Sequence, residues 1–424
     1  MRFGVLAVAI IVAILAVGCL EAGQNGYPQQ SGVETGLQSS RAPSLPPSSQ
    51  LNDAQPPADP EKAKLGLAPC GNRKELFSMP PTDMEKVVTM TPVGMMSPPS
   101  HVFPAPHMYF FPLDFKSPED VEIPIYASGN MTLTQIGLRH YNTLGQYENY
   151  IDYTLVFSPC TGFDLYFHHL RSLTYPPFIE AAGEILKKCS FGADNNEDYC
   201  SGEVSIPIEA GRQFATAGDL KAGVWGFDLG ARDYRLEGGT DFANPSRHCD
   251  RQGNVFDRCY VVCPFDYFTA DILGELKFSG SFGSAGGLGC GGDLYFDVEG
   301  TAQGYWFKKG SAKTVFWESD NIYLGPDNLN PSVSAISTGT AVPGLESGLY
   351  EFEPQSVGMV NRDFKQVSND GQVYCYETSS GQQQGNAAIL VEITSSATLR
   401  VGKHSSRSCG AGPWPFGAYQ DFER

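Results

Sequence analysis

Short apolar and aromatic stretches alternate along this chain with turns rich in Gly, Pro and Asn. Segments in which Val, Ile, Tyr and Phe recur at every second position are typical of half-buried β-strands. One helix is predicted at 177–186, where Pro177 opens the segment and apolar residues recur at spacings of three and four. In the first part of the chain the pattern predicts strands at 121–127, 131–141, 150–157, 163–170, 203–209 and 224–229.

A second series of strands follows a linking region at 242–268, and it includes an Asp370-Gly371 turn. The sequence therefore predicts a mostly β protein, with an antiparallel β domain at 69–268 (core 100–235) and a second all-β sandwich or barrel domain at 269–424. The predicted strands of this second domain are 294–298, 302–307, 314–317, 348–352, 372–377, 387–394 and 397–401.

The N-terminus predicts export. Arg2 precedes an uncharged apolar run, and small residues come directly before Cys19. This layout resembles a lipoprotein signal, in which Cys19 becomes the lipidated first residue and anchors the protein to the outer face of the cell membrane. An uncleaved helical anchor and plain secretion are the alternatives. Residues 20–68, rich in Ser, Pro, Gln and Gly without apolar periodicity, predict a flexible tether.

Ten cysteines remain when Cys19 is set aside, and an even number in an exported chain predicts up to five disulfides. Cys189 and Cys200 are the favoured local pair, because they bracket a short polar loop. A zinc ribbon at Cys259 and Cys263 is the alternative, but its second paired knuckle is missing.

The charge of the chain limits the classes of partner that it can bind. The chain has 29 basic and 47 acidic side chains, a net charge of −18, and no basic run, so a nucleic-acid partner is excluded. Asn130 begins the only permitted glycosylation triplet, Asn-Met-Thr.

Four motifs occur in a recognisable order between residues 100 and 235. This order resembles the lysostaphin-type zinc endopeptidases, which cut peptidoglycan cross-bridges and have a small antiparallel β-fold also known as the duplicated hybrid motif. The resemblance covers about a third of the chain. The motifs are Pro-Ile-Tyr-Ala (124–127), Leu-Tyr-Phe-His-His-Leu (165–170), Ile-Pro-Ile-Glu-Ala-Gly-Arg-Gln-Phe-Ala-Thr-Ala-Gly (206–218) and Trp-Gly-Phe-Asp-Leu (225–229).

The functional positions of that family are only partly kept. The first zinc ligand falls on His107, but Phe111 stands where the family has an Asp. The aromatic-x-His-Leu motif places His169 at the position of the catalytic His. The family's His-x-His pair falls on Val224 and Gly226, and neither side chain can bind a metal.

A rebuilt zinc site is one interpretation of these differences. Strand alternation sends residues 226 and 228 to the same face, so Asp228 with His107 and His169 could hold the metal. The same alternation sends His168 and His169 to opposite faces, so at most one of them is expected in a groove. In the alternative, Asp228 joins a polar network and His107 packs against aromatic neighbours. Further candidate ligands are His101, Asp114, His140, His168 and Asp233.

The loss of family ligands favours a surface-anchored protein that is not an enzyme and needs no cofactor. Its peptidase-like domain would bind a cell-envelope glycan, a peptide or a protein partner. The alternative is an active zinc-dependent cell-wall endopeptidase with the rebuilt ligand set, in which His169 is catalytic.

Membrane attachment provides a first test. If Cys19 carries the lipid, a Cys19→Ser variant of the full chain should move from the membrane fraction to the soluble fraction, because the acylation site is gone. Cell fractionation and immunoblotting measure this. Unchanged membrane retention would favour an uncleaved helix.

Overall fold

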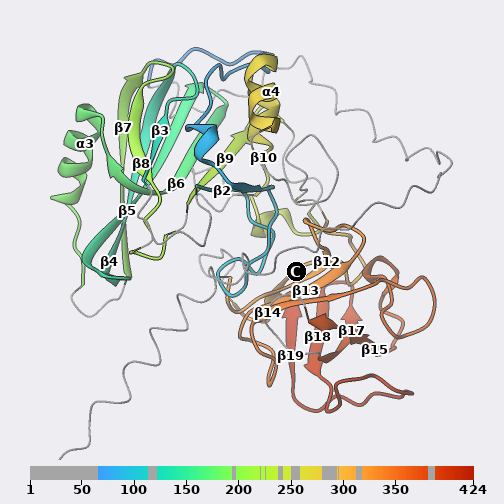
Figure 1. Cartoon of the computed structure of the whole chain (residues 1–424). Coiled ribbons are helices and arrows are strands. Elements are labelled where there is room, and N and C mark those ends of the chain that lie inside the picture. The colour runs from blue at the N-terminus through green and yellow to red at the C-terminus, as the bar shows by residue number, and fades with distance from the viewer. Residues whose placement is uncertain are drawn as a thin grey trace, which may run out of the picture.

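Figure 1 shows the computed structural model, which describes residues 65–424 except 113–121, 193–196, 220, 225, 237–241, 250–257, 279–293, 295, 312–317 and 381–386. The described residues form two β-sheets, and every strand pairing in these sheets is antiparallel. No helix within these residues is long and apolar enough to cross a membrane. The predicted signal segment and tether lie almost entirely outside the described part.

The first sheet runs in the order β1-β2-β9-β6-β5-β4-β7, while β8 bridges β3 to β6 and β10 pairs with β9. Its helices are α3 (Pro176–Leu186), which contacts β7, β4 and β6, and α4 (Ala270–Phe278). The strands are β1 (Thr89–Thr91), β2 (Met108–Phe111), β3 (Ile123–Tyr126), β4 (Met131–Leu144), β5 (Tyr147–Cys160), β6 (Phe163–Leu173), β7 (Glu197–Ile208), β8 (Gln213–Ala217), β9 (Phe227–Asp233) and β10 (Val261–Val262).

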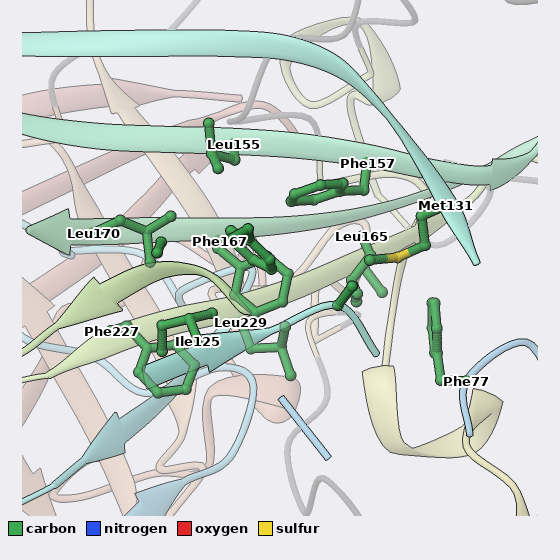
Figure 2. Packing of buried hydrophobic residues seen from close by; sticks show 14 of the residues in the cluster. Phe77, Ile125, Met131, Leu155, Phe157, Leu165, Phe167, Leu170, Phe227 and Leu229 are labelled. Carbon is green, nitrogen blue, oxygen red and sulfur yellow. The ribbon is translucent and has the colours of Figure 1, made fainter. Parts of the chain in front are cut away.

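Aromatic rings pack among Leu, Ile and Met side chains in the core of this first domain (Figure 2). Phe157 on β5 is fully buried, and its ring lies 5.8 Å from Phe167, 5.9 Å from Phe178 and 4.9 Å from Phe214, centroid to centroid. Phe178 comes from α3, so the helix covers the sheet through its apolar stripe. Side chains of three strands and one helix therefore meet at one ring.

The second sheet runs in the order β15-β17-β18-β19-β11-β12-β13-β14-β16 within the described residues. Buried Ile336 and Tyr350 from one end share a cluster with Ile389 and Leu399 from the other, so the sheet folds over its own core. The strands are β11 (Gly304–Lys308), β12 (Ile322–Pro326), β13 (Ser334–Thr338), β14 (Gly348–Phe352), β15 (Tyr374–Glu377), β16 (Ser379–Ser380), β17 (Ala388–Ser395), β18 (Thr398–Lys403) and β19 (Tyr419–Glu423).

The mostly β, antiparallel fold is as predicted from the sequence, and the predicted helix is α3. The strand predicted at 294–298 is wrong, because the described residues of that range are irregular. Its first residue, Leu294, belongs to the core of the first domain. The strands β1, β2, β8, β10, β12, β13, β16 and β19 were not predicted, and 314–317 lies outside the described residues.

Two short 3₁₀ turns, Met84–Lys86 and Pro264–Tyr267, add buried side chains to the first domain. Two more occur at Pro245–Arg247 and Phe364–Gln366.

A third apolar cluster joins the two domains, with Phe103 from the first domain packed against Tyr305 and Phe307 of the second. The domains therefore share a buried contact.

Four disulfides connect described residues, and they include the predicted Cys189–Cys200 pair. The others are Cys70–Cys160, Cys249–Cys259 and Cys375–Cys409. Cys263 is also disulfide-bonded, to a partner outside the described residues. The zinc-ribbon alternative is therefore wrong, and the disulfides are compatible with an extracellular protein.

The aromatic core makes a quantitative prediction. Phe157→Ala should lower the free energy of unfolding of the first domain by about 3 to 5 kcal/mol, because it removes a fully buried ring and leaves a cavity. Urea denaturation followed by circular dichroism measures this. The control is Ile179→Ala, at a half-exposed position of α3, which should cost less than about 0.5 kcal/mol. Equal losses in both variants would contradict this account of the core.

Candidate metal centre

Three adjacent strands bring three potential metal ligands to one face of the sheet. Asp228 on β9 lies opposite Tyr109 of β2 on one side and opposite His168 of β6 on the other. His107 directly precedes β2 and is two residues from Tyr109, so strand alternation places it on the same face. His107, His168 and Asp228 form a group of potential metal ligands whose donor atoms all lie within 4.8 Å of one another.

The carboxylate oxygen Oδ2 of Asp228 is the common point of the cluster. It lies 3.2 Å from Nε2 of His107 and 3.8 Å from Nδ1 of His168. It also lies 3.5 Å from Nε2 of His169. One buried carboxylate oxygen therefore faces three imidazoles.

These contacts leave hydrogen-bonding capacity unused. The side chains of His107 and Asp228 are 4% and 3% exposed, and that of His168 is 15% exposed. Neither ring nitrogen of His107 has a hydrogen-bond partner among the described residues, so its 3.2 Å contact with Asp228 lacks hydrogen-bond geometry. Nε2 of His168 is also unpartnered. Buried polar atoms without partners are costly in a native protein. A cation beside Oδ2 of Asp228 would bind one nitrogen of each ring, Nε2 of His107 and Nδ1 of His168.

Electrostatics keep two of the imidazoles neutral. Burial lowers the pKa of both His107 and His168 well below the ordinary value of 6.5, and neighbouring histidines lower it further. Burial also raises the pKa of Asp228 to about 6, against the opposing influence of His169. Neutral imidazoles and a carboxylate are the donors that zinc takes from proteins.

The distances suit that ion. Zinc binds imidazole nitrogen and carboxylate oxygen at about 2.0 to 2.2 Å in a tetrahedral arrangement, which puts neighbouring donor atoms about 3.3 to 3.6 Å apart. The 3.2 and 3.8 Å separations from Asp228 Oδ2 bracket that range. Three protein ligands leave the fourth position of a zinc ion open.

His169 lies beside the three ligands and is held by a second carboxylate. Its Nδ1 is 2.7 Å from Oδ2 of Asp152, a buried residue of β5, while 35% of its own side chain is exposed. Burial favours the neutral ring, but the attraction of Asp152 and then of Asp228 is stronger and raises the pKa of His169 to about 9. The side chain is thus oriented by one carboxylate and reachable from solvent.

The expectation that only one of His168 and His169 could line the site is wrong. His169 has a φ of 60°, in the left-handed region that residues with a Cβ rarely adopt. The β5–β6 register runs from Leu155 opposite Phe167 to Tyr153 opposite Leu170, so β6 carries one extra residue there. This bulge interrupts the alternation, and both imidazoles approach Asp228.

Gly226, one of the two positions where the resemblance would place the His-x-His pair, has no room for a side chain. A Cβ on Gly226 would lie 1.9 Å from the carbonyl oxygen of Phe110, so no side chain fits at that position without a shift of β2 or β9. Phe111, four residues beyond His107, stacks on Tyr109. His107 also contacts Tyr109 edge to face, so the predicted aromatic packing and the proximity to Asp228 coexist.

The remaining candidates lie outside the ligand group. His101 packs edge-on against His107 with ring centroids 5.2 Å apart. His140 stacks on Phe191. Asp233 binds Arg235 and Tyr267. Asn130 is exposed and accepts a hydrogen bond from the Ala210 amide. Asp114 and Cys19 lie outside the described residues.

Sequence reasoning missed Asp152 altogether. The sequence feature that could have pointed to Asp152 is an acidic residue inside the predicted strand 150–157. In the structure Asp152 lies opposite Arg139 of the neighbouring strand β4. Only the bulge in β6 brings His169 to it.

Comparison of the chain with family models, with curated proteins and with solved structures returned no match.

Backbone packing next to the site makes a testable prediction. The hydroxyl of Tyr166 donates to the carbonyl of Pro106, the residue before His107, and a Cβ on Gly230 would lie 2.0 Å from the Tyr166 ring. Gly230→Ala should therefore destabilise the first domain by about 1 to 3 kcal/mol, because the ring must move. In a Tyr166→Ala background the same change should cost much less. Thermal unfolding of all four proteins measures this coupling, and a cost independent of Tyr166 would contradict it.

Proposed function

We propose that this protein is an exported, membrane-anchored zinc hydrolase whose ligands are His107, His168 and Asp228. One observation carries the proposal: the buried side chains of His107 and Asp228 and the largely buried side chain of His168 converge on one point, and His169, held by Asp152, lies beside them. A metal that only stabilised the fold would not need a third, partly exposed imidazole oriented by its own carboxylate.

Each residue has a distinct role in this proposal. The three ligands hold the ion, and a zinc ion there would act as a Lewis acid and lower the pKa of water. His169 contributes a positioned proton donor at neutral pH, because its pKa is raised to about 9 and its Nε2 faces the cluster while Nδ1 is tied to Asp152. Asp152 fixes the tautomer and ring orientation of His169, as a carboxylate behind a functional imidazole commonly does.

The substrate class follows from the resemblance of residues 100–235 to cell-wall endopeptidases. We infer that the bond cleaved is an amide in a peptide of the cell envelope. A lipidated Cys19 and the tether at 20–68 would keep the domain near such a substrate. The disulfides suit that location.

A non-catalytic binding protein is the second candidate, and two observations favour it. Two of the three proposed metal ligands, His107 and Asp228, are deeply buried, as in a structural metal site. In addition, two adjoining surface hollows of about 500 and 810 Å³ share Tyr175 and Arg212 and include none of the ligands. A glycan or peptide bound there would need no chemistry at the metal centre.

Metal content tests the ligand set. Full-length protein purified without chelators or a polyhistidine tag should contain about one equivalent of zinc by elemental mass spectrometry. His107→Ala, His168→Ala and Asp228→Asn should each lose most of it, because two protein ligands bind zinc poorly. His404→Ala, which changes a histidine of the second domain, is the control and should keep its zinc. A metal-free wild-type protein that remains folded would refute the proposal.

Hydrolysis separates the two candidate functions. His169→Asn and Asp152→Asn should keep their zinc but cleave peptidoglycan-derived peptides at least about 100-fold more slowly, because they remove the proton-transfer group or its orienting partner. Release of new amino groups measures cleavage. If zinc-loaded wild-type protein and both variants are equally inactive, the non-catalytic candidate is favoured.

A further inference from the structure

A closed loop leads into the metal centre. Residues 94–105, which we call the docking loop, connect β1 to the start of β2 and end two residues before His107. The Gly94 amide donates to the Ala105 carbonyl at 2.8 Å, which closes the base of the loop. Ser97 and His101 exchange two backbone hydrogen bonds, of 2.9 and 3.0 Å, near its tip. Because these hydrogen bonds close the loop at its base and near its tip, we treat it as one structural unit.

The C-terminal domain holds this loop at two places. The Phe103 amide donates to Oε2 of Glu318 at 2.8 Å, and the Phe103 ring lies 5.0 Å from Tyr305 between centroids. The side-chain amide of Asn328 donates to the Gly94 carbonyl at 2.6 Å. All of these groups are buried, so the contacts are shielded from water (the segment ahead of β2 extends toward the second domain in Figure 1).

The same loop contacts a proposed zinc ligand. His101 packs its ring edge-on against His107, 5.2 Å between centroids, and His107 itself follows the loop by two residues. Both ring nitrogens of His107 lack hydrogen-bond partners among the described residues, so ring packing has a large part in setting its orientation. A zinc ligand that is not oriented by hydrogen bonds depends on such packing.

We propose that the C-terminal domain positions the metal centre through the docking loop, with Glu318 and Asn328 as positioning residues. Zinc affinity and the docking of the loop on the second domain are then coupled. This inference rests on the proposed zinc site. Thermodynamic linkage makes the coupling reciprocal: if docking orients His107 for zinc, bound zinc must strengthen docking by the same factor.

Substitutions at the two positioning residues differ in how much they disturb the fold. Glu318 also pairs with buried Arg258, so Glu318→Gln leaves a buried guanidinium poorly compensated and can disturb folding. Asn328→Ala removes the neutral hydrogen bond to the Gly94 carbonyl without leaving a charge unpaired, so it is the milder variant. Asp320→Asn is the matched control, because Asp320 is exposed, lies two residues from Glu318 and pairs only with Lys308 among the described residues.

The experiment measures zinc affinity in the full-length proteins by competition with a chromophoric chelator. Asn328→Ala and Glu318→Gln should weaken zinc binding about 10-fold, the size expected when a residue supporting a metal ligand is removed. Asp320→Asn should leave the affinity unchanged. Zinc should slow hydrogen exchange of peptides spanning 94–105 in the wild-type protein, and this slowing should be absent from His168→Ala.

Two results would overturn the inference in distinguishable ways. If the variants have lower melting temperatures but bind zinc as tightly as the wild-type protein, the contacts only stabilise the fold and the coupling is absent. An unchanged exchange rate at 94–105 on zinc addition would likewise show that zinc and docking are not coupled. If the wild-type protein binds no zinc, the proposed function fails, and this inference fails with it.

Discussion

The buried carboxylate of Asp228 is the constraint on which the surrounding structure depends. An isolated charge inside a protein is costly, so a buried carboxylate requires positive charge or donors around it. His107, His168 and His169 approach Oδ2 of Asp228 at 3.2 to 3.8 Å, but none makes a well-formed hydrogen bond to it. Protonated His169 compensates the charge in part and is itself held by Asp152. A divalent cation would compensate the carboxylate charge and bind one nitrogen of each neutral imidazole as well.

The site lies where the β-sheet departs from regular geometry. His169 occupies a left-handed backbone conformation that costs about 1 to 2 kcal/mol for a residue with a Cβ. The bulge it creates carries two neighbouring imidazoles to one carboxylate. Gly226 permits a contact between β9 and β2 that any side chain would prevent. Irregular backbone that survives in a well-packed sheet is commonly associated with function, which agrees with the proposed role of this cluster.

Periodicity was sufficient to predict the fold class, because most strands of the first sheet alternate apolar and polar residues. It was insufficient for β12 and β13, which are buried on both faces and show no alternation. The proximity of His107 to Asp228 was expected from the family resemblance, which placed a ligand at His107, combined with the alternation that puts residues 226 and 228 on one face. The joint approach of His168 and His169 was not, because it depends on one extra residue in β6 that only strand pairing reveals.

Strand register is enough to explain which side chains gather around Asp228. Residues that pair across adjacent antiparallel strands lie on the same face of a sheet, so the neighbours of Asp228 are set by its partners on β6 and β2. His168 is the β6 residue paired with Asp228, and His107 lies on the same face beside Tyr109, the β2 partner. His107 also follows the docking loop by two residues and packs against His101 within it. In our proposal, the orientation of His107 therefore depends on the contacts between that loop and the neighbouring domain.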